Sequence, residues 1–256
     1  MKIKQNGVWE FPPEGIQWKQ NGAWETGVIR YVLATDDDFS GETDGSFRYI
    51  GTDEYVEIPH VIKGVNVTSY ASMFRGTSVK EVASNNKNVT NMHGTFRDLQ
   101  ATSLDLSNFD TSSVTNMNYM FSDSQATSLD LSSFDTSSVT DMLFMFYRSQ
   151  ATILDLSSFD TSSVTGMAFM FADLQATSLD LSSFDTSSVT SMISMFRALP
   201  ATNLDLSSFD TSSVTNMSQM FRDSQVTIGY ARTQADADRF NNSSAKPARL
   251  TFIVKD

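Results

Sequence analysis

The chain has 256 residues and carries 18 Lys and Arg against 30 Asp and Glu, a formal net charge of −12 at pH 7. This acidic balance excludes the attraction to phosphates on which nucleic-acid binding depends. The absence of cysteine excludes disulfides and thiolate zinc sites, whereas 40% hydrophobic residues suffice for a packed core.

The first 27 residues contain a duplicated motif. Lys4-Gln5-Asn6-Gly7-Val8-Trp9-Glu10 recurs from Lys19 to Glu25, and Asn-Gly between short runs is a strong signal for a β-hairpin. Residues 1–27 are therefore predicted to form two hairpins that attach the protein to other proteins of a virion or surface assembly, because a hairpin alone is marginally stable. The sequence predicts no signal peptide, no transmembrane segment and no membrane insertion.

A short acidic segment follows. Asp36, Asp38 and Ser40 place oxygen donors at alternate positions, and a glycine stands sixth, as in the front half of a calcium loop. The twelfth position is Phe47, where such a loop has a bidentate glutamate. Two readings stay open, a weak calcium site at these three residues and a solvated acidic turn, which the missing glutamate favours. No other metal site and no cofactor is predicted.

A strict repeat of 25 residues occupies the centre of the chain. Each unit opens with Leu-Asp-Leu-Ser and continues Phe-Asp-Thr-Ser-Ser-Val-Thr, and a period of this length indicates a solenoid. The units begin at Leu104, Leu129, Leu154, Leu179 and Leu204. Residues 99–225 are thus predicted as five regular repeats, and residues 28–98, where the pattern is looser, as irregular repeats that cap the stack.

Within a unit, the alternation of Leu104 and Leu106 with polar neighbours predicts a short strand with one buried face. The spacing of Val114, Met117 and Met120 predicts one stripe of a helix. The fold class predicted is α/β, a leucine-rich-repeat-like right-handed solenoid with a parallel sheet on the concave side and short helices on the convex side. Helices need about 8 to 10 Å and strands about 4.8 Å, so the stack should curve.

Two rows of aspartates follow from stacking. The first should line the exposed sheet face and consists of Asp105, Asp130, Asp155, Asp180 and Asp205. It is either a strip that binds cations or a basic partner, with pKa values raised by mutual repulsion, or a solubilising row. The second precedes Thr-Ser-Ser, should bond backbone N–H groups at the turn into the helix, and consists of Asp110, Asp135, Asp160, Asp185 and Asp210.

The units differ most at the position two residues after the first Met. Tyr119, Phe144 and Phe169 occupy it in three units, and Tyr147 lies close by. On a helix this position points away from the buried stripe, which predicts an exposed aromatic row on the convex side that binds a partner. The alternative is that the rings bury one another or are covered in an oligomer, which the sequence allows.

The last segment, residues 226–256, breaks the repeat and is predicted to cap the core. Thr233-Gln234-Ala235-Asp236 has the form of a capping box and predicts a short helix to about Phe240. Residues 250–254 predict a final edge strand.

The nearly intact kernel Leu-Asp-Leu-Ser-Ser-Phe-Asp-Thr-Ser-Ser-Val-Thr-x-Met-x-x-Met-Phe resembles the BspA-like leucine-rich-repeat family of bacterial surface proteins, over about residues 47–226. The resemblance implies adhesion through protein or glycan binding, and no catalytic residues. The duplicated Asn-Gly-x-Trp segment is similar to N-terminal pieces of tail proteins of phages that infect Gram-positive bacteria, which implies a location on a virion tail or another extracellular surface.

Three functions are compatible with these patterns. The favoured one is a non-enzymatic adhesion or receptor-binding module whose partner is a host cell-surface protein or glycan. The second is a structural spacer in a multiprotein assembly. A hydrolase ranks last, because repeats supply rows of identical carboxylates where a hydrolase needs a pair in a cleft.

Overall fold

The structure is a computed structural model that describes residues 3–5, 8–10, 16–20, 23–27, 32–41 and 47–255. One α-helix, one short 3-10 helix and seventeen strands are defined among these residues. They are β1 (Ile3–Gln5), β2 (Val8–Glu10), β3 (Ile16–Gln20), β4 (Ala23–Gly27), β5 (Val32–Leu33), η1 (Asp36–Asp38), β6 (Phe39–Gly41), β7 (Phe47–Tyr49), β8 (Tyr55–Glu57), β9 (Val61–Ile62), β10 (Val65–Asn66), β11 (Glu81–Ala83), β12 (Ser103–Leu104), β13 (Ser128–Asp130), β14 (Ile153–Asp155), β15 (Asn203–Leu206), β16 (Ile228–Ala231), α1 (Gln234–Asn241) and β17 (Thr251–Val254).

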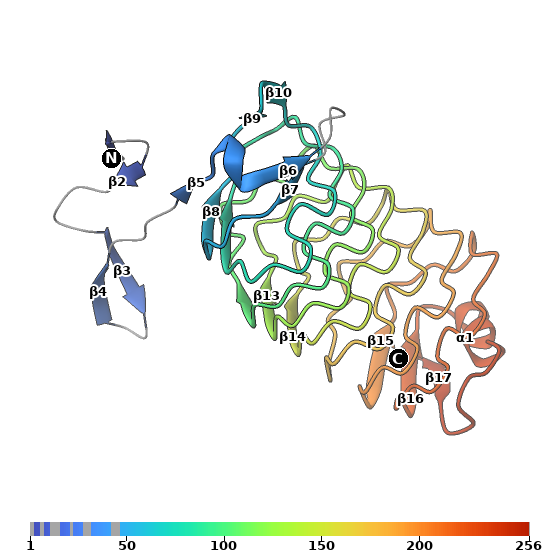
Figure 1. Cartoon of the computed structure of the whole chain (residues 1–256). Helices are drawn as coiled ribbons and strands as arrows, with labels where there is room; N and C mark the ends of the chain where they lie inside the picture. The colour runs from blue at the N-terminus through green and yellow to red at the C-terminus, as the bar shows by residue number, and fades with distance from the viewer. Residues whose placement is uncertain are drawn as a thin grey trace.

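The chain from β5 onward winds into a stack of coils (Figure 1). Short strands of successive coils pair in parallel in three sheets, ordered β11-β8-β5, β12-β13-β14 and β15-β16-β17. Leu104 pairs with Leu129, and Leu129 with Leu154, so that the register equals the 25-residue repeat. A second ladder of single parallel bridges runs from Ser69 through Asn116 to Asn216 on another side of the stack. The protein is a parallel β-solenoid.

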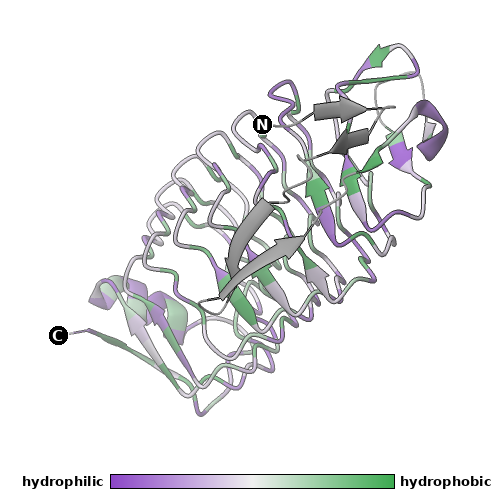
Figure 2. Cartoon of the chain, turned by 90° about the vertical axis from the view of Figure 1, so that its left-hand side faces the viewer, coloured by the Kyte–Doolittle hydropathy of each residue, from purple (hydrophilic) through white to green (hydrophobic). Residues whose placement is uncertain are grey.

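Equivalent apolar residues form continuous ladders inside the coils. Phe121, Phe146 and Phe171 stack with ring centroids 5.6 and 5.8 Å apart, and all three are fully buried. Methionines such as Met117 and Met142 run beside them, also fully buried. Figure 2 shows apolar and polar residues interspersed along each coil.

The predicted convex helices are wrong. Residues 118–123 form turns, and the backbone N–H groups of this stretch bond across coils as well as locally. The N–H of Tyr119 donates to the C=O of Leu143 at 2.9 Å, and the N–H of Phe121 to that of Met145 at 2.9 Å. An α-helix would instead direct these donors to carbonyls four residues earlier in the same coil.

Left-handed backbone at two positions per coil explains why no helix forms. Tyr119 and Asp123 both have φ of +58°, and the equivalent residues of the other regular coils share this conformation. A right-handed helix cannot pass through such a residue. The predicted curvature rested on helices that need a wider spacing than strands. Turns that bond from coil to coil have the same separation as the strands, so this reason for curvature disappears.

The N-terminal strands pair as the duplicated motif predicts. β1 pairs antiparallel with β2, and β3 with β4. The connecting Asn-Gly residues lie outside the described residues, and the attachment role of residues 1–27 stays a prediction. The irregular repeats between residues 47 and 98 join the same stack, since β8 pairs in parallel with both β5 and β11.

The C-terminal cap contains the predicted helix and strand. Thr233 is the N-cap of α1, and its side chain accepts a hydrogen bond from the N–H of Asp236. β17 closes the last sheet, and its outer edge is occupied by the side-chain amide of Asn241, which bonds both the N–H and the C=O of Phe252 at 2.9 Å. Because these groups are satisfied, this position of the edge is closed to a further strand.

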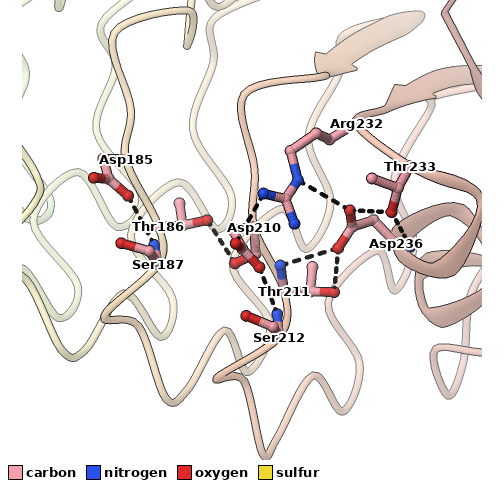
Figure 3. Close-up of polar contacts among 9 residues, drawn as sticks. All are labelled: Asp185, Thr186, Ser187, Asp210, Thr211, Ser212, Arg232, Thr233 and Asp236. Carbon is pink, nitrogen blue, oxygen red and sulfur yellow. Dashed lines mark hydrogen bonds and ion pairs between the residues drawn. The ribbon is translucent and has the colours of Figure 1, made fainter.

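Side chains of the cap also replace the missing next coil (Figure 3). In the regular coils, Thr186 donates through Oγ1 to the C=O of Asp210 at 2.9 Å. In the last coil, the N–H and Oγ1 of Thr211 donate to Oδ1 of Asp236 at 3.0 and 2.6 Å. The buried Asp236 also accepts from Oγ1 of Thr233 and pairs with Arg232, which bridges to Asp210. A carboxylate therefore stands where the next coil would present a backbone carbonyl.

Substituting Ala198 by glycine should test the turn geometry. Ala198 has φ of +53°, where an L-residue costs about 1 to 2 kcal/mol relative to glycine. Ala198→Gly should therefore raise the free energy of unfolding by up to ~1 kcal/mol, after the added entropy of the unfolded chain is subtracted. Ala176→Gly, at a buried position without positive φ, should lower it. Urea denaturation measures both, and a loss of stability in Ala198→Gly would contradict the assignment.

Acid should weaken the cap. Burial raises the pKa of Asp236, but the hydrogen bonds from Thr211, Thr233 and Arg232 outweigh it and leave the pKa below its usual value. A carboxyl with a lowered folded pKa stabilises the protein above its unfolded pKa of about 3.9 and loses this contribution as pH falls through the folded value. Asp236→Asn should therefore cost about 1.5 to 3 kcal/mol at neutral pH.

The difference between Asp236→Asn and the unsubstituted protein should shrink as pH falls below about 4. Urea midpoints at neutral and acid pH measure it. An equal difference at both pH values would show that the ionised carboxylate is not what holds the cap.

Candidate binding surface

The strand aspartates are exposed or half-buried, as predicted for a row on the sheet, but each one is engaged in a local turn. Oδ1 of Asp105 accepts the N–H of Ser107 at 2.9 Å, and Oδ1 of Asp155 accepts that of Ser157 at 3.0 Å. The same bond recurs for the other members of the row, Asp130, Asp180 and Asp205. These aspartates terminate the strand by bonding the backbone two residues on.

The rise in pKa expected for a cation-binding strip is wrong for Asp155, Asp180 and Asp205. Hydrogen bonds from Ser157 and Ser182 hold the pKa values of Asp155 and Asp180 below the usual value. Repulsion from neighbouring aspartates acts on Asp180 in the opposite direction but is the smaller effect. At Asp205 burial raises the pKa, and bonds from Lys255 and Ser207 outweigh it. Asp155, Asp180 and Asp205 therefore stay ionised at neutral pH.

The second aspartate row has the predicted structural role, at a turn rather than at a helix. Oδ1 of Asp160 accepts from both the N–H and Oγ of Ser162, at 3.0 and 2.6 Å. The backbone bond recurs in the other members of the row, Asp110, Asp135, Asp185 and Asp210. The preceding coil adds a further contact, since Thr136 donates to the C=O of Asp160 at 2.9 Å.

The carboxylates of the acidic segment accept hydrogen bonds from Thr35 and Lys63. Asp38 accepts through Oδ2 from the N–H and Oγ1 of Thr35, at 2.7 and 2.9 Å, and Asp36 accepts the N–H of Lys63 at 2.6 Å. Ser40 lies in β6, with its hydroxyl directed to the C=O of Arg48. Within residues 32–41 and 47–255, no three acidic or histidine side chains converge as a metal would require. These contacts support the reading as an acidic turn.

The aromatic row is a stack of half-buried rings, hereafter the aromatic stack, formed by Tyr119, Phe144 and Phe169. Tyr119 and Phe144 are parallel within 5° at a centroid distance of 4.6 Å, and Phe144 and Phe169 within 6° at 4.5 Å. Tyr147 stands at right angles to both phenylalanines. The expected full exposure on a convex side is thus corrected, because the two faces of Phe144 are covered by its neighbours and its edge faces outward.

The fold does not require rings at these positions. The equivalent residues of other coils are Ser72, Gly94, Ser194 and Gln219, and all have positive φ like the aromatic residues. A left-handed conformation is unfavourable for bulky side chains. The rings are therefore a local addition to a turn that forms without them.

A polar groove of about 350 Å³ runs across four coils beside the stack. Each coil contributes one residue from a left-handed turn position and one glutamine two residues later. The lining residues are Asp98, Gln100, Asp123, Gln125, Arg148, Gln150, Asp173 and Gln175. Arg97 and Arg148 connect the groove to the aromatic side chains, with Arg97 5.2 Å from the ring of Tyr119 and Arg148 6.0 Å from that of Tyr147.

Arginines balance the acidic residues of the groove. Arg75 pairs with Asp98 at 2.9 Å, Arg148 with Asp123 at 3.4 Å, and Arg197 with Asp173. Each of the three aspartates that line the groove is therefore ion-paired, and Asp98 has Arg97 as a second partner at 3.7 Å.

Sequence reasoning missed this groove, although a signal was present. Asp or Arg followed by glutamine recurs in four successive coils and is replaced in the next by Ala198 and Pro200. The same coil has Ser194 in place of the aromatic ring. Groove and stack thus end at the same coil, although the groove begins one coil earlier, where Gly94 stands in place of a ring.

A comparison with known families matches the family described as Mycoplasma protein of unknown function, DUF285, over residues 68–178 and again over residues 150–247. The chain belongs to this family, which supports the resemblance to BspA-like repeat surface proteins. No curated protein matches the chain. The only α-helix of the described residues, α1, has 8 residues, and none of their helices could cross a bilayer.

Two phenylalanines of one turn should differ in their contribution to stability. Phe146→Ala empties a fully buried ladder position and should cost about 3 to 5 kcal/mol. Phe144→Ala removes two stacking contacts of about 0.5 to 1.5 kcal/mol each from a half-buried position that serine or glycine fills elsewhere. Chemical denaturation of both variants measures the difference, and equal losses would show that the aromatic stack belongs to the core.

Proposed function

We propose that this member of the DUF285 family is a non-enzymatic binding module that recognises a component of a host cell surface. The aromatic stack carries the proposal. Its three rings occupy strained backbone positions that the fold fills elsewhere with small or polar residues, and they leave a half-exposed apolar edge beside a polar groove. Such apolar surface outside the core is typical of interaction sites.

The lowered pKa values of the carboxylates support a role in binding over a role in catalysis. General acid catalysis at neutral pH needs a carboxyl with a raised pKa. Hydrogen bonds from serines lower the pKa values of Asp155, Asp160, Asp180 and Asp185 in both aspartate rows. These side chains hold turns together and stay ionised.

We also propose that the protein acts on the outside of a larger assembly. Residues 1–27 attach the solenoid to other proteins, and the stack of coils then presents the aromatic stack and the groove to the outside. A tail of a phage that infects Gram-positive bacteria is the assembly that the duplicated Asn-Gly-x-Trp motif favours, and a bacterial surface is the alternative.

The triple variant Tyr119→Ser/Phe144→Ser/Phe169→Ser should lose at least tenfold in retention on Gram-positive cells or purified cell walls. Serine is tolerated at this position, as Ser194 shows, so the variant should stay folded. Co-sedimentation and flow cytometry of the labelled full chain measure retention, and circular dichroism checks the fold.

Ile153→Ser is the matched control, because Ile153 is 67% exposed on the strand side, away from the stack. Its retention should equal that of the unsubstituted chain. Absence of retention by the unsubstituted chain, or equal retention by the folded triple variant, would refute the proposal and leave a spacer role.

A further inference from the structure

We infer that the polar groove binds a neutral linear glycan that runs along the solenoid axis, with one sugar for each coil. The inference rests on the proposed function and specifies the class of ligand.

The side chains of the groove match the hydroxyl groups of sugars. A glutamine amide supplies two donors and one acceptor, and carboxylates add acceptors. Among the described residues, the side-chain amides of Gln125 and Gln150 form no hydrogen bond with protein groups. Gln100 and Gln175 donate only to carbonyls of their own turns, those of Asp98 and Asp173, which leaves their amide oxygens as acceptors.

The charge of the groove selects a neutral ligand. Asp98, Asp123 and Asp173 are each paired with an arginine, so an anionic polymer meets carboxylates and a cationic one meets guanidinium groups. Neutral hydroxyl groups can bond to both kinds of side chain without displacing these pairs. Ion-paired carboxylates also have fixed orientations, which reduces the entropy lost on binding.

The spacing of the groove suits a repeating ligand. Coils joined by strand pairing lie about 4.8 Å apart, similar to the rise of one sugar in an extended pyranose chain. Each of four successive coils presents one charged side chain and one glutamine to the groove, which has a volume of about 350 Å³. The fifth coil carries Ala198 and Pro200, whose side chains have no hydrogen-bonding groups, so the binding length is four sugars.

Tyr147 is the aromatic side chain that contacts a residue of the groove, since the guanidinium carbon of Arg148 lies 6.0 Å from its ring centroid. Both faces of Phe144 are covered within the aromatic stack, which prevents a sugar from stacking there. Tyr147 is turned by 87° and 90° from the planes of Phe144 and Phe169, and it precedes the groove residue Arg148 in sequence. Its phenol interacts with Arg197, the ion-pair partner of Asp173, and so places a hydroxyl group beside the groove.

The test is an array of linear oligosaccharides of two to six sugars, with neutral hexose and N-acetylhexosamine series and acidic uronate series, probed with the full chain. We expect binding to at least one neutral series, with affinity that rises up to four sugars and then stays constant. Gln125→Ala/Gln150→Ala should weaken this binding at least tenfold, whereas Gln225→Ala, at the same repeat position outside the groove, should not change it.

A variant that extends the groove tests the inference by a gain in affinity, which an unfolded protein could not produce. Ala198→Asp/Pro200→Gln gives the fifth coil the pattern of its neighbours and continues it to Asp223 and Gln225. Asp173 and Asp223 already show that aspartate accepts this left-handed position. The affinity of the variant should keep rising beyond four sugars.

Binding to acidic oligosaccharides alone, no binding to any neutral series, or an unchanged length dependence in the extended variant would overturn the inference. Retention on cells that survives the loss of both glutamines would overturn it as well, yet leave the proposed function intact. Loss of retention only in the triple variant of the aromatic stack would assign recognition to the stack alone.

Discussion

The hydrogen bond from a backbone N–H of one coil to a carbonyl of the next is the interaction on which the structure depends. It fixes the register, so that each residue lies above its equivalent 25 residues earlier, as Leu129 lies above Leu104. Once the register is fixed, identical side chains must form columns, and apolar columns such as Phe121, Phe146 and Phe171 become a continuous core. The open end of such a stack leaves these bonds unmade, and Asp236 and Asn241 supply side-chain substitutes there.

The same register brings like charges together on the outside. Each aspartate accepts hydrogen bonds from the serine two residues on. Bonds from the serine side chain and from its N–H lower the pKa of Asp155, Asp160 and Asp185, and at Asp185 they outweigh repulsion from neighbouring carboxylates. The coils differ from one another where the repeat is broken. Tyr119, Phe144 and Phe169 depart from the small or polar residues of equivalent turns, and the groove beside them ends where Ala198 and Pro200 interrupt its pattern. The proposed function places recognition on these departures from the repeat, whereas the constant positions maintain the fold.

Much of this arrangement could be predicted from the residues. The 25-residue period predicted the stacking and the register. Thr233 and Asp236 predicted the cap helix, and the Asn-Gly motifs predicted the paired N-terminal strands. The turns could not be distinguished from helices, because the spacing of Val114, Met117 and Met120 buries one face in either conformation. A left-handed backbone at Tyr119 has no signal in that residue itself, although Gly94 at the equivalent position provides one. The direction of the pKa shifts depends on hydrogen bonds from serines. The sequence pattern alone could not show that these bonds outweigh the repulsion between neighbouring aspartates.

Backbone N–H groups of the Met-x-x-Met-Phe segment donate to carbonyl groups of the next coil. Scalar couplings across hydrogen bonds, measured by NMR on the isotope-labelled protein, identify the acceptor of each backbone donor. The structure requires a coupling between the amide nitrogen of Tyr119 and the carbonyl carbon of Leu143, and another between Phe121 and Met145. Couplings from these amides to carbonyls four residues earlier in the same coil would contradict the account and restore the helical repeat.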